Sequence, residues 1–197
     1  MSNASSSTST AQPVNTNNIE NAEKGIDGIE FNSDIRLDSS SGKERLIIKY
    51  SVKNNSNKPV LVFNQGDESN PGRFTVYIEP MADGTVEISK RGFLPPDNPS
   101  PTYVVYPGAL KLEPGKNITD TVELTLQYIT RRRPYASVTP AANMPETIKK
   151  VRFCLGIAPS EGVELKPVGD GNKKILITDF NGLARQQLLC SEVKTIR

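Results

Sequence analysis

Residues 45–54 read RLIIKYSVKN, and this stretch decides the fold class. Every second side chain from Leu46 to Val52 is apolar or aromatic, and the side chains between them after Ile48 are polar. Successive side chains of a β-strand point to opposite faces, so a period of two predicts a strand with one buried face and one solvent face. A helix would instead repeat its apolar residues every three to four positions. The chain is therefore expected to be built from β-strands.

Other segments have the composition or the alternation of strands. They are 60–63, 73–80, 82–89, 117–127, 147–159, 168–180 and 185–196. Residues 54–59 are rich in turn formers and are expected to fold 45–54 back onto 60–63. Asp83-Gly84 is expected to form a second hairpin, and Asn181-Gly182 is expected to join the last two strands. We predict an all-β fold, an antiparallel β-sandwich of eight to ten strands, with a barrel as the alternative.

The first 25 residues differ in composition from the rest. They are rich in Ser, Thr and Asn, so residues 1–25 are predicted to form a disordered tether and 26–197 a single β-sandwich domain. Residues 2–4 read SNA, which is typical of a cloning remnant, and the tether resembles the segment that follows the lipidated cysteine of bacterial lipoproteins. We therefore expect a periplasmic or extracellular protein whose natural N-terminus carried an export signal or lipid anchor.

Charge and residue content exclude several classes of function. The 24 basic and 22 acidic residues give a net charge of +2, which is too small for a typical nucleic-acid binder. The chain has no histidine, so Ser-His-Asp and Cys-His catalytic pairs and His-containing zinc sites are excluded. We find no calcium loop, Gly-rich phosphate loop or cofactor motif. No enzymatic activity, cofactor, metal or nucleic-acid partner is expected.

The two cysteines, Cys154 and Cys190, are far apart in the sequence and form no CxxC pair. If 151–157 and 186–195 are neighbouring strands, these cysteines can form a disulfide bond, which would indicate an oxidising compartment. Two buried thiols in a cytosolic protein are the alternative.

The run ITRRRPYASVTP at 129–140 contains the candidate binding residues Arg131, Arg132, Arg133 and Tyr135. In a strand, Arg131 and Arg133 would point to one face and Arg132 to the other, so only a turn could gather all three. One interpretation is a charged strand end that keeps a sheet edge from pairing with other chains. The other is a binding site in which Tyr135 is an exposed anchor beside Arg133.

Asp120 is an exception within the segment 117–127. This segment alternates with Ile118, Val122 and Leu124 in the inward phase, and Asp120 shares that phase. A carboxylate at such a position indicates either a β-bulge or a buried, hydrogen-bonded acid. Both interpretations remain open at the level of sequence.

Three segments carry a resemblance to known domains: LIIKYSVKNNSNKPVLVF, FTVYIEPMADGTVEIS and LEPGKNITDTVEL. A strand that ends in Asn-x-Ser, a Pro-led strand after it and a later Pro-Gly turn resemble bacterial immunoglobulin-like sandwich domains, among them uncharacterised exported proteins. The similarity spans 44–126. A looser similarity links the chain to the intracellular proteinase inhibitor domain family, although no inhibitory-loop residue can be matched. The resemblance implies an immunoglobulin-like sandwich.

These observations predict a non-enzymatic binding module of the bacterial cell envelope. Its contacts are expected in the two longest loops, 91–107 and 130–146, since loops on a rigid scaffold commonly carry function. The expected partner is a protein or another envelope component, and membrane contact is expected only through an N-terminal anchor. A protease inhibitor that presents one of these loops to an enzyme is the alternative. The sequence does not indicate an oligomeric state.

Overall fold

The computed structural model describes residues 26–40, 42–72, 75–97, 103–169 and 174–196. In these ranges the strands are β1 (Ile29–Asp38), β2 (Arg45–Asn54), β3 (Val60–Val62), β4 (Tyr77–Pro80), β5 (Thr85–Lys90), β6 (Leu110–Leu112), β7 (Asn117–Thr125), β8 (Lys150–Pro159), β9 (Leu165–Val168), β10 (Ile175–Thr178), β11 (Gln187–Cys190) and β12 (Lys194–Thr195). A 3-10 helix, η1 (Leu126–Tyr128), and a short helix, α1 (Phe180–Ala184), complete the elements. The all-β prediction is confirmed, with more strands than expected. The predicted tether, 1–25, lies outside the described residues.

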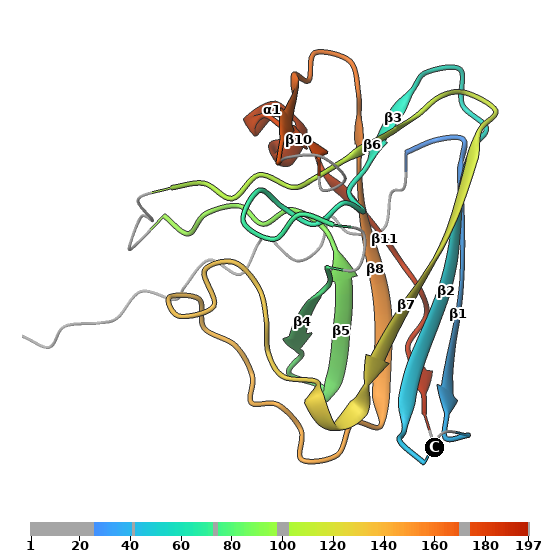
Figure 1. Cartoon of the computed structure of the whole chain (residues 1–197), viewed down its shortest axis with the longest axis vertical. Coiled ribbons are helices and arrows are strands. Elements are labelled where there is room, and N and C mark those ends of the chain that lie inside the picture. The colour runs from blue at the N-terminus through green and yellow to red at the C-terminus, as the bar shows by residue number, and fades with distance from the viewer. Residues whose placement is uncertain (1–25, 41, 73–74, 98–102, 170–173, 197) are drawn as a thin grey trace, which may run out of the picture.

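One layer is the sheet β1-β2-β7, in which both pairings are antiparallel. Its central strand β2 corresponds to the stretch 45–54 that predicted the fold. Leu46, Ile48, Tyr50 and Val52 are all buried, as the alternation required. The three strands run side by side along one flank of the molecule (Figure 1).

The other layer is a seven-stranded sheet with the order β4-β5-β8-β3-β6, to which β11 and β12 add by pairing with β8. One pair in it departs from the antiparallel prediction, because β5 and β8 are parallel. Parallel neighbours need a long crossover, and residues 91–149 provide one. That crossover contains both loops predicted to bind a partner. They lie on the same flank, opposite β1, and this flank is here called the loop flank (Figure 1).

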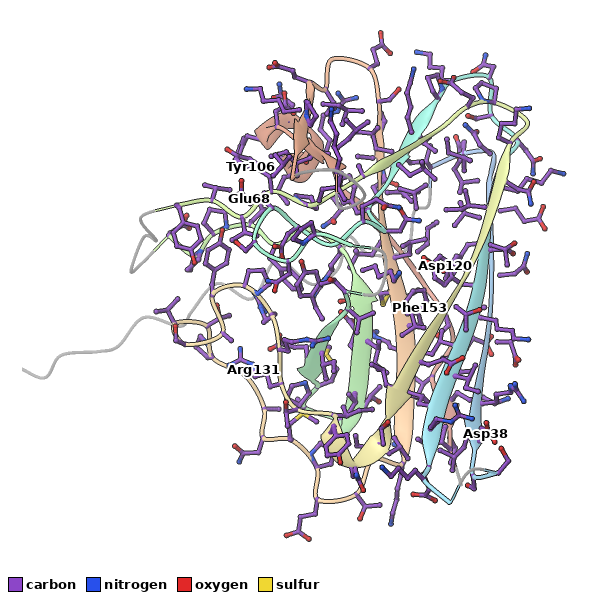
Figure 2. All side chains as sticks on the ribbon, in the orientation of Figure 1. Asp38, Glu68, Tyr106, Asp120, Arg131 and Phe153 are labelled. Atoms are coloured by element: carbon purple, nitrogen blue, oxygen red, sulfur yellow. A yellow bond between two sulfur atoms is a disulfide. The ribbon has the colours of Figure 1, made fainter. Side chains whose placement is uncertain are left out.

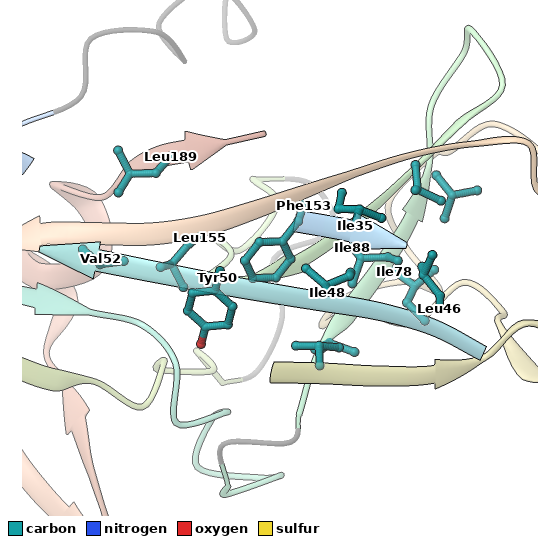
Figure 3. Close-up of a cluster of buried hydrophobic side chains, with 14 of the residues drawn as sticks. Ile35, Leu46, Ile48, Tyr50, Val52, Ile78, Ile88, Phe153, Leu155 and Leu189 are labelled. Atoms are coloured by element: carbon teal, nitrogen blue, oxygen red, sulfur yellow. The ribbon is translucent and has the colours of Figure 1, made fainter. Parts of the chain in front are cut away.

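The main core lies between the two layers. Phe153 of β8 packs on Tyr50 of β2 with 4.9 Å between ring centroids, and aliphatic side chains from both sheets surround them (Figure 3). A smaller cluster of Leu61, Phe63 and Ala158 covers the other face of the large sheet. Strand β8 is therefore buried on both faces, which sequence alternation alone did not indicate.

The predicted hairpin between 45–54 and 60–63 is wrong. Strand β3 belongs to the opposite sheet, where it pairs with β6 and β8 rather than with β2. Asn54 causes the change of sheet: its buried amide donates to the carbonyls of Lys58 and Leu112, both at 2.9 Å, and its Oδ1 accepts from the Ser56 N–H at 3.0 Å. These bonds make 54–59 a corner between layers.

The Asp83-Gly84 hairpin is confirmed, and Gly84 has the positive φ of 79° that such a turn requires. The Asn181-Gly182 hairpin is wrong, because both residues lie within α1. Asp179 caps this helix by accepting from the Gly182 N–H at 3.0 Å, so the dipeptide is part of a helical turn.

Asp120 is a half-buried, hydrogen-bonded acid rather than a bulge. It stays in regular register opposite Tyr50, and its Oδ2 accepts from the Tyr50 hydroxyl and from Lys90 Nζ, both at 3.2 Å. The Lys90 side chain is only 1% exposed, so this ion pair joins the two sheets inside the protein. Burial, reinforced by the Asp120 charge, raises the pKa of Tyr50 well above its usual range.

Candidate functional site: the loop flank

The predicted disulfide bond between Cys154 and Cys190 is confirmed. The two residues are direct partners across β8 and β11, with 4.1 Å between their Cα atoms. In the chain-entropy account, a loop of this length contributes roughly 3 to 4 kcal/mol. A disulfide is compatible with a location outside the cytoplasm. Within the described ranges, neither helix has the length and apolar character needed to cross a membrane.

The arginine run lies beside the edge strand β4 and is joined to it by a single antiparallel bridge, between Arg132 and Ile78. Arg132 donates its N–H to the carbonyl of Ile78 at 2.9 Å and accepts from the Ile78 N–H at 2.7 Å. The backbone is thus extended at this point, and the three side chains alternate as predicted. The bridge also occupies part of the β4 edge, which agrees with the interpretation of edge protection.

Arg131 and Arg133 point to the same side and share one carboxylate. Glu79 of β4 accepts from Arg131 Nε at 3.2 Å and from Arg133 Nη1 at 3.2 Å, and its side chain is 12% exposed. Arg131 also donates to the carbonyls of Ala136 at 2.7 Å and Thr139 at 2.8 Å. These two arginines therefore fasten the loop 130–146 to the sheet (Figure 2 labels Arg131).

A second set of cations lies beside the first. The guanidinium groups of Arg133 and Arg91 are each 4.5 Å from the ring centroid of Phe93. Arg91 and Arg152 both pair with Glu87 of β5, at 3.1 Å and 2.6 Å. Burial lowers the pKa of Arg91, and Glu87 opposes that shift. Stacking on the ring and pairing with buried acids hold these guanidinium groups in fixed positions.

Arg132 points to the other side of the segment. Its Nε and Nη2 donate to the carbonyl of Val76, at 3.1 and 2.9 Å, and its guanidinium lines a pocket. Among the described residues, no carboxylate lies within ion-pair distance of Arg132. The run of three identical residues therefore divides into a pair that shares one carboxylate and one exposed arginine that lines the pocket.

Tyr135 is half-buried, which differs from the exposed anchor considered for it. Its hydroxyl accepts from the Val105 N–H at 2.8 Å, and its carbonyl accepts from the N–H groups of Val138 and Thr139. It has a φ of 61°, a conformation uncommon for a bulky side chain. Tyr135 thus joins the two predicted binding loops to each other and shapes the turn after the arginines.

The two loops meet a third segment around one pocket of about 390 Å³, here called the loop pocket. Its walls come from 67–72, Thr75, Tyr77, 103–105 and 132–134. In Figure 2 the labels Glu68, Tyr106 and Arg131, each directly next to a residue of the pocket wall, show that the three segments lie on one flank. The segment 67–72 was not predicted as part of a site. Its sequence, DESNPG, consists of turn-forming residues and gave the only available signal.

Asp67 shapes the floor of the loop pocket. Its Oδ1 accepts from the N–H groups of Ser69 at 2.8 Å and Asn70 at 2.7 Å, and its Oδ2 accepts from the Tyr77 hydroxyl. Burial, and after it the Asp67 charge, raises the pKa of Tyr77 well above its usual range. Tyr77 therefore remains a neutral donor, and Asp67 is fully engaged in holding the turn.

A larger hollow, of about 640 Å³, lies beside η1 and is lined in part by Pro145 and Glu146 of the loop 130–146. Apolar residues such as Ile129, Ile148 and Ile196 line it. Glu146 and Lys149 at its rim are exposed and form no ion pair within the described part of the chain. The loop pocket is the stronger candidate, since its polar groups converge and are held by hydrogen bonds.

The described residues contain no group of three or more His, Cys, Asp or Glu side chains that could hold a metal ion. Comparison of the chain with protein-family models, curated proteins and solved structures gave no match.

Proposed function

We propose that this chain is a non-enzymatic binding module of the bacterial cell envelope that holds a protein or envelope partner through its loops 91–107 and 130–146. The observation that carries the proposal is the loop pocket. Two segments far apart in the sequence, 103–105 and 132–134, form opposite parts of one pocket, and Tyr135 links them directly. A rigid scaffold that presents loops in this way is a common arrangement for recognition.

Fixed side chains around the pocket support binding rather than chemistry. Arg131 and Arg133 share Glu79, while Asp67 accepts three hydrogen bonds from its own turn and from Tyr77. These acids are engaged in structure and are poorly placed to act as a general base. Preorganised loops lose little conformational entropy on binding, which favours affinity.

The Cys154–Cys190 disulfide supports the proposed location, the periplasm or the cell exterior. A lipid anchor ahead of the Ser/Thr/Asn-rich segment would hold the sandwich at the envelope, with the loop flank free to meet a partner. The immunoglobulin-like assignment belongs to the same proposal and agrees with the two stacked sheets.

One observation favours a second candidate, a protease inhibitor. The Arg131 side chain donates hydrogen bonds to the carbonyls of both Ala136 and Thr139, and these bonds hold the segment 134–139 in one conformation. Rigid loops of this kind can occupy a protease active site as a substrate does without rearranging. Inhibition of a panel of serine and cysteine proteases, lost on Arg131→Ala, would establish this candidate instead.

Photo-crosslinking in the native organism tests the proposed function. A photoreactive phenylalanine replaces Tyr103 at the pocket rim in one variant and the exposed Lys49 of β2 in the other. We expect a specific cross-linked partner from position 103 and not from position 49, identified by mass spectrometry. The same products from both positions, or none from position 103, would refute the assignment of the loop flank.

A further inference from the structure

We propose that Arg132 anchors a carboxylate carried next to an apolar side chain, such as the C-terminal residue of an extended peptide, in the loop pocket. This inference rests on the proposed binding function and specifies the chemistry of the partner. The guanidinium of Arg132, the aromatic side chains of Tyr77 and Tyr103, and Val105 are the groups that would meet the ligand.

Among the described residues Arg132 has no ion-pair partner, unlike its two neighbours. The neighbours Arg131 and Arg133 share the single carboxylate of Glu79, which offsets one of their two positive charges. Asp67 lines the same pocket, but its oxygens are occupied by Tyr77 and by backbone N–H groups. A ligand carboxylate would therefore provide the missing anion.

The backbone and side chain of Arg132 are also held in place before any ligand binds. Its backbone is held by both hydrogen bonds to Ile78, and the Val76 carbonyl accepts from Nε and Nη2. A guanidinium has five N–H donors, so the two bonds to Val76 leave donors for a planar carboxylate. A side chain already fixed at one end loses little rotamer entropy when a ligand arrives.

The remaining walls favour an apolar group beside the anion. Pro71, Tyr77, Tyr103, Val105 and Pro134 contribute apolar surface, and Tyr103 is 62% exposed. A volume of about 390 Å³ is near the small end of ligand pockets and suits one or two residues rather than a large metabolite.

Three acetylated tetrapeptides ending in phenylalanine test the inference. The first has a free α-carboxylate, the second is the C-terminal amide, and the third is the amide with glutamate before the phenylalanine. Binding to the full chain is followed by NMR shifts of the backbone amides of 103–105 and of the Arg132 Nε–Hε group. We expect the free acid to bind and shift both sets of signals, and the simple amide to bind at least about tenfold more weakly.

Arg132→Gln should weaken binding of the free acid by about tenfold or more, and Arg132→Lys should weaken it less because the charge remains. Arg36→Gln, on the exposed side of β1, is the matched control and should change nothing. If Arg132→Gln alters the fold, Arg132→Lys still tests the inference, provided that its backbone amide spectrum matches that of the wild type.

Binding of the glutamate peptide as tightly as the free acid would support the carboxylate site and assign it to acidic side chains. Equal binding of acid and simple amide, equal affinity in Arg132→Lys, Arg132→Gln and wild type, or no shifts with any peptide would overturn the inference. In each of those cases, capture of a partner from position 103 would still support the proposed function, so the two failures are distinguishable.

Discussion

The two flanks of the molecule are held together by different forces. The flank β1-β2-β7, here called the strand flank, consists of three strands joined by regular ladders, and apolar side chains attach it to the rest, together with the Lys90–Asp120 ion pair. The opposite flank contains the long loops, and ion pairs and hydrogen bonds from arginines to carbonyl groups hold it in place. Apolar burial supplies most of the stability of a domain, whereas individual polar contacts contribute little net free energy.

Because of this difference, we expect the strand flank to determine the fold and the loop flank to tolerate the changes that a binding function requires. Apolar packing is non-directional and tolerates little change in volume, so the strand flank should respond to substitutions as part of the cooperative unit. The loop flank depends on a few directional contacts, and their loss should loosen it locally. Three substitutions of decreasing expected effect test this contrast.

Phe153→Ala should have the largest effect. The side chain is 0% exposed and contacts the aromatic rings of Tyr50 and Phe31 from the centre of β8. Removing a buried phenylalanine costs about 3 to 5 kcal/mol of unfolding free energy, measured by urea denaturation. Phe180, at 51% exposure, is the matched control, and its change to alanine should cost less than about 0.5 kcal/mol. Equal losses in the two variants would contradict the account of the core.

The strand flank was the part of the fold that the sequence could predict. The alternation of apolar and polar residues in 45–54 and 117–125 can be read from neighbouring residues alone. It predicts a strand because a strand with one buried face needs an apolar side chain at every second position. The corner at Asn54 could not be predicted, because its amide is satisfied by Leu112, far along the chain. Asn181-Gly182 was misread because the cap from Asp179 outweighed the turn preference of the dipeptide.

The candidate site was predictable only in part. The alternation of the three arginines follows from an extended backbone, and the lengths of loops 91–107 and 130–146 marked them as binding loops. The roles of the arginines depend on Glu79 and Val76, which lie more than fifty positions away. Nothing in the sequence near Tyr135 indicates that its hydroxyl meets Val105. Pairings across such separations are set by topology, and the parallel β5–β8 pair was itself not predicted.

Glu79→Gln should have an intermediate effect, confined to the loop flank. The change keeps the shape of the side chain but leaves Arg131 and Arg133 without their shared charge. We expect a loss of about 1 to 2 kcal/mol, since these are charge-assisted bonds in a site that is still partly open to solvent. Hydrogen exchange should accelerate at the amides of Val138 and Thr139, which bond to Tyr135.

Glu161→Gln is the matched control for this substitution. Glu161 pairs with Lys58 at the surface, where the two side chains are 76% and 70% exposed, so its loss should be close to zero. Faster exchange across β2 in Glu79→Gln would show that the loop flank is part of the main cooperative unit, which would contradict the contrast between the flanks.

The smallest effect concerns a polar contact at the end of the strand flank, where Asp38 is the last residue of β1 and is paired with Arg45. Hydrogen bonds from Ser40, and to a lesser extent Arg45, lower the pKa of Asp38 from 3.8 to about 2. A carboxyl group with a depressed pKa stabilises the folded state above its unfolded pKa, and this contribution disappears as the pH falls from about 4 to about 2. Asp38→Asn should therefore reduce the dependence of the unfolding free energy on pH in that window and leave it unchanged between pH values of about 5 and 7. Ser40→Ala should produce part of the same change, since it removes the hydroxyl but keeps the backbone N–H that donates to Asp38 at 3.0 Å. A pH profile in Asp38→Asn identical to that of the wild type would show that this turn contributes nothing to the stability of the strand flank.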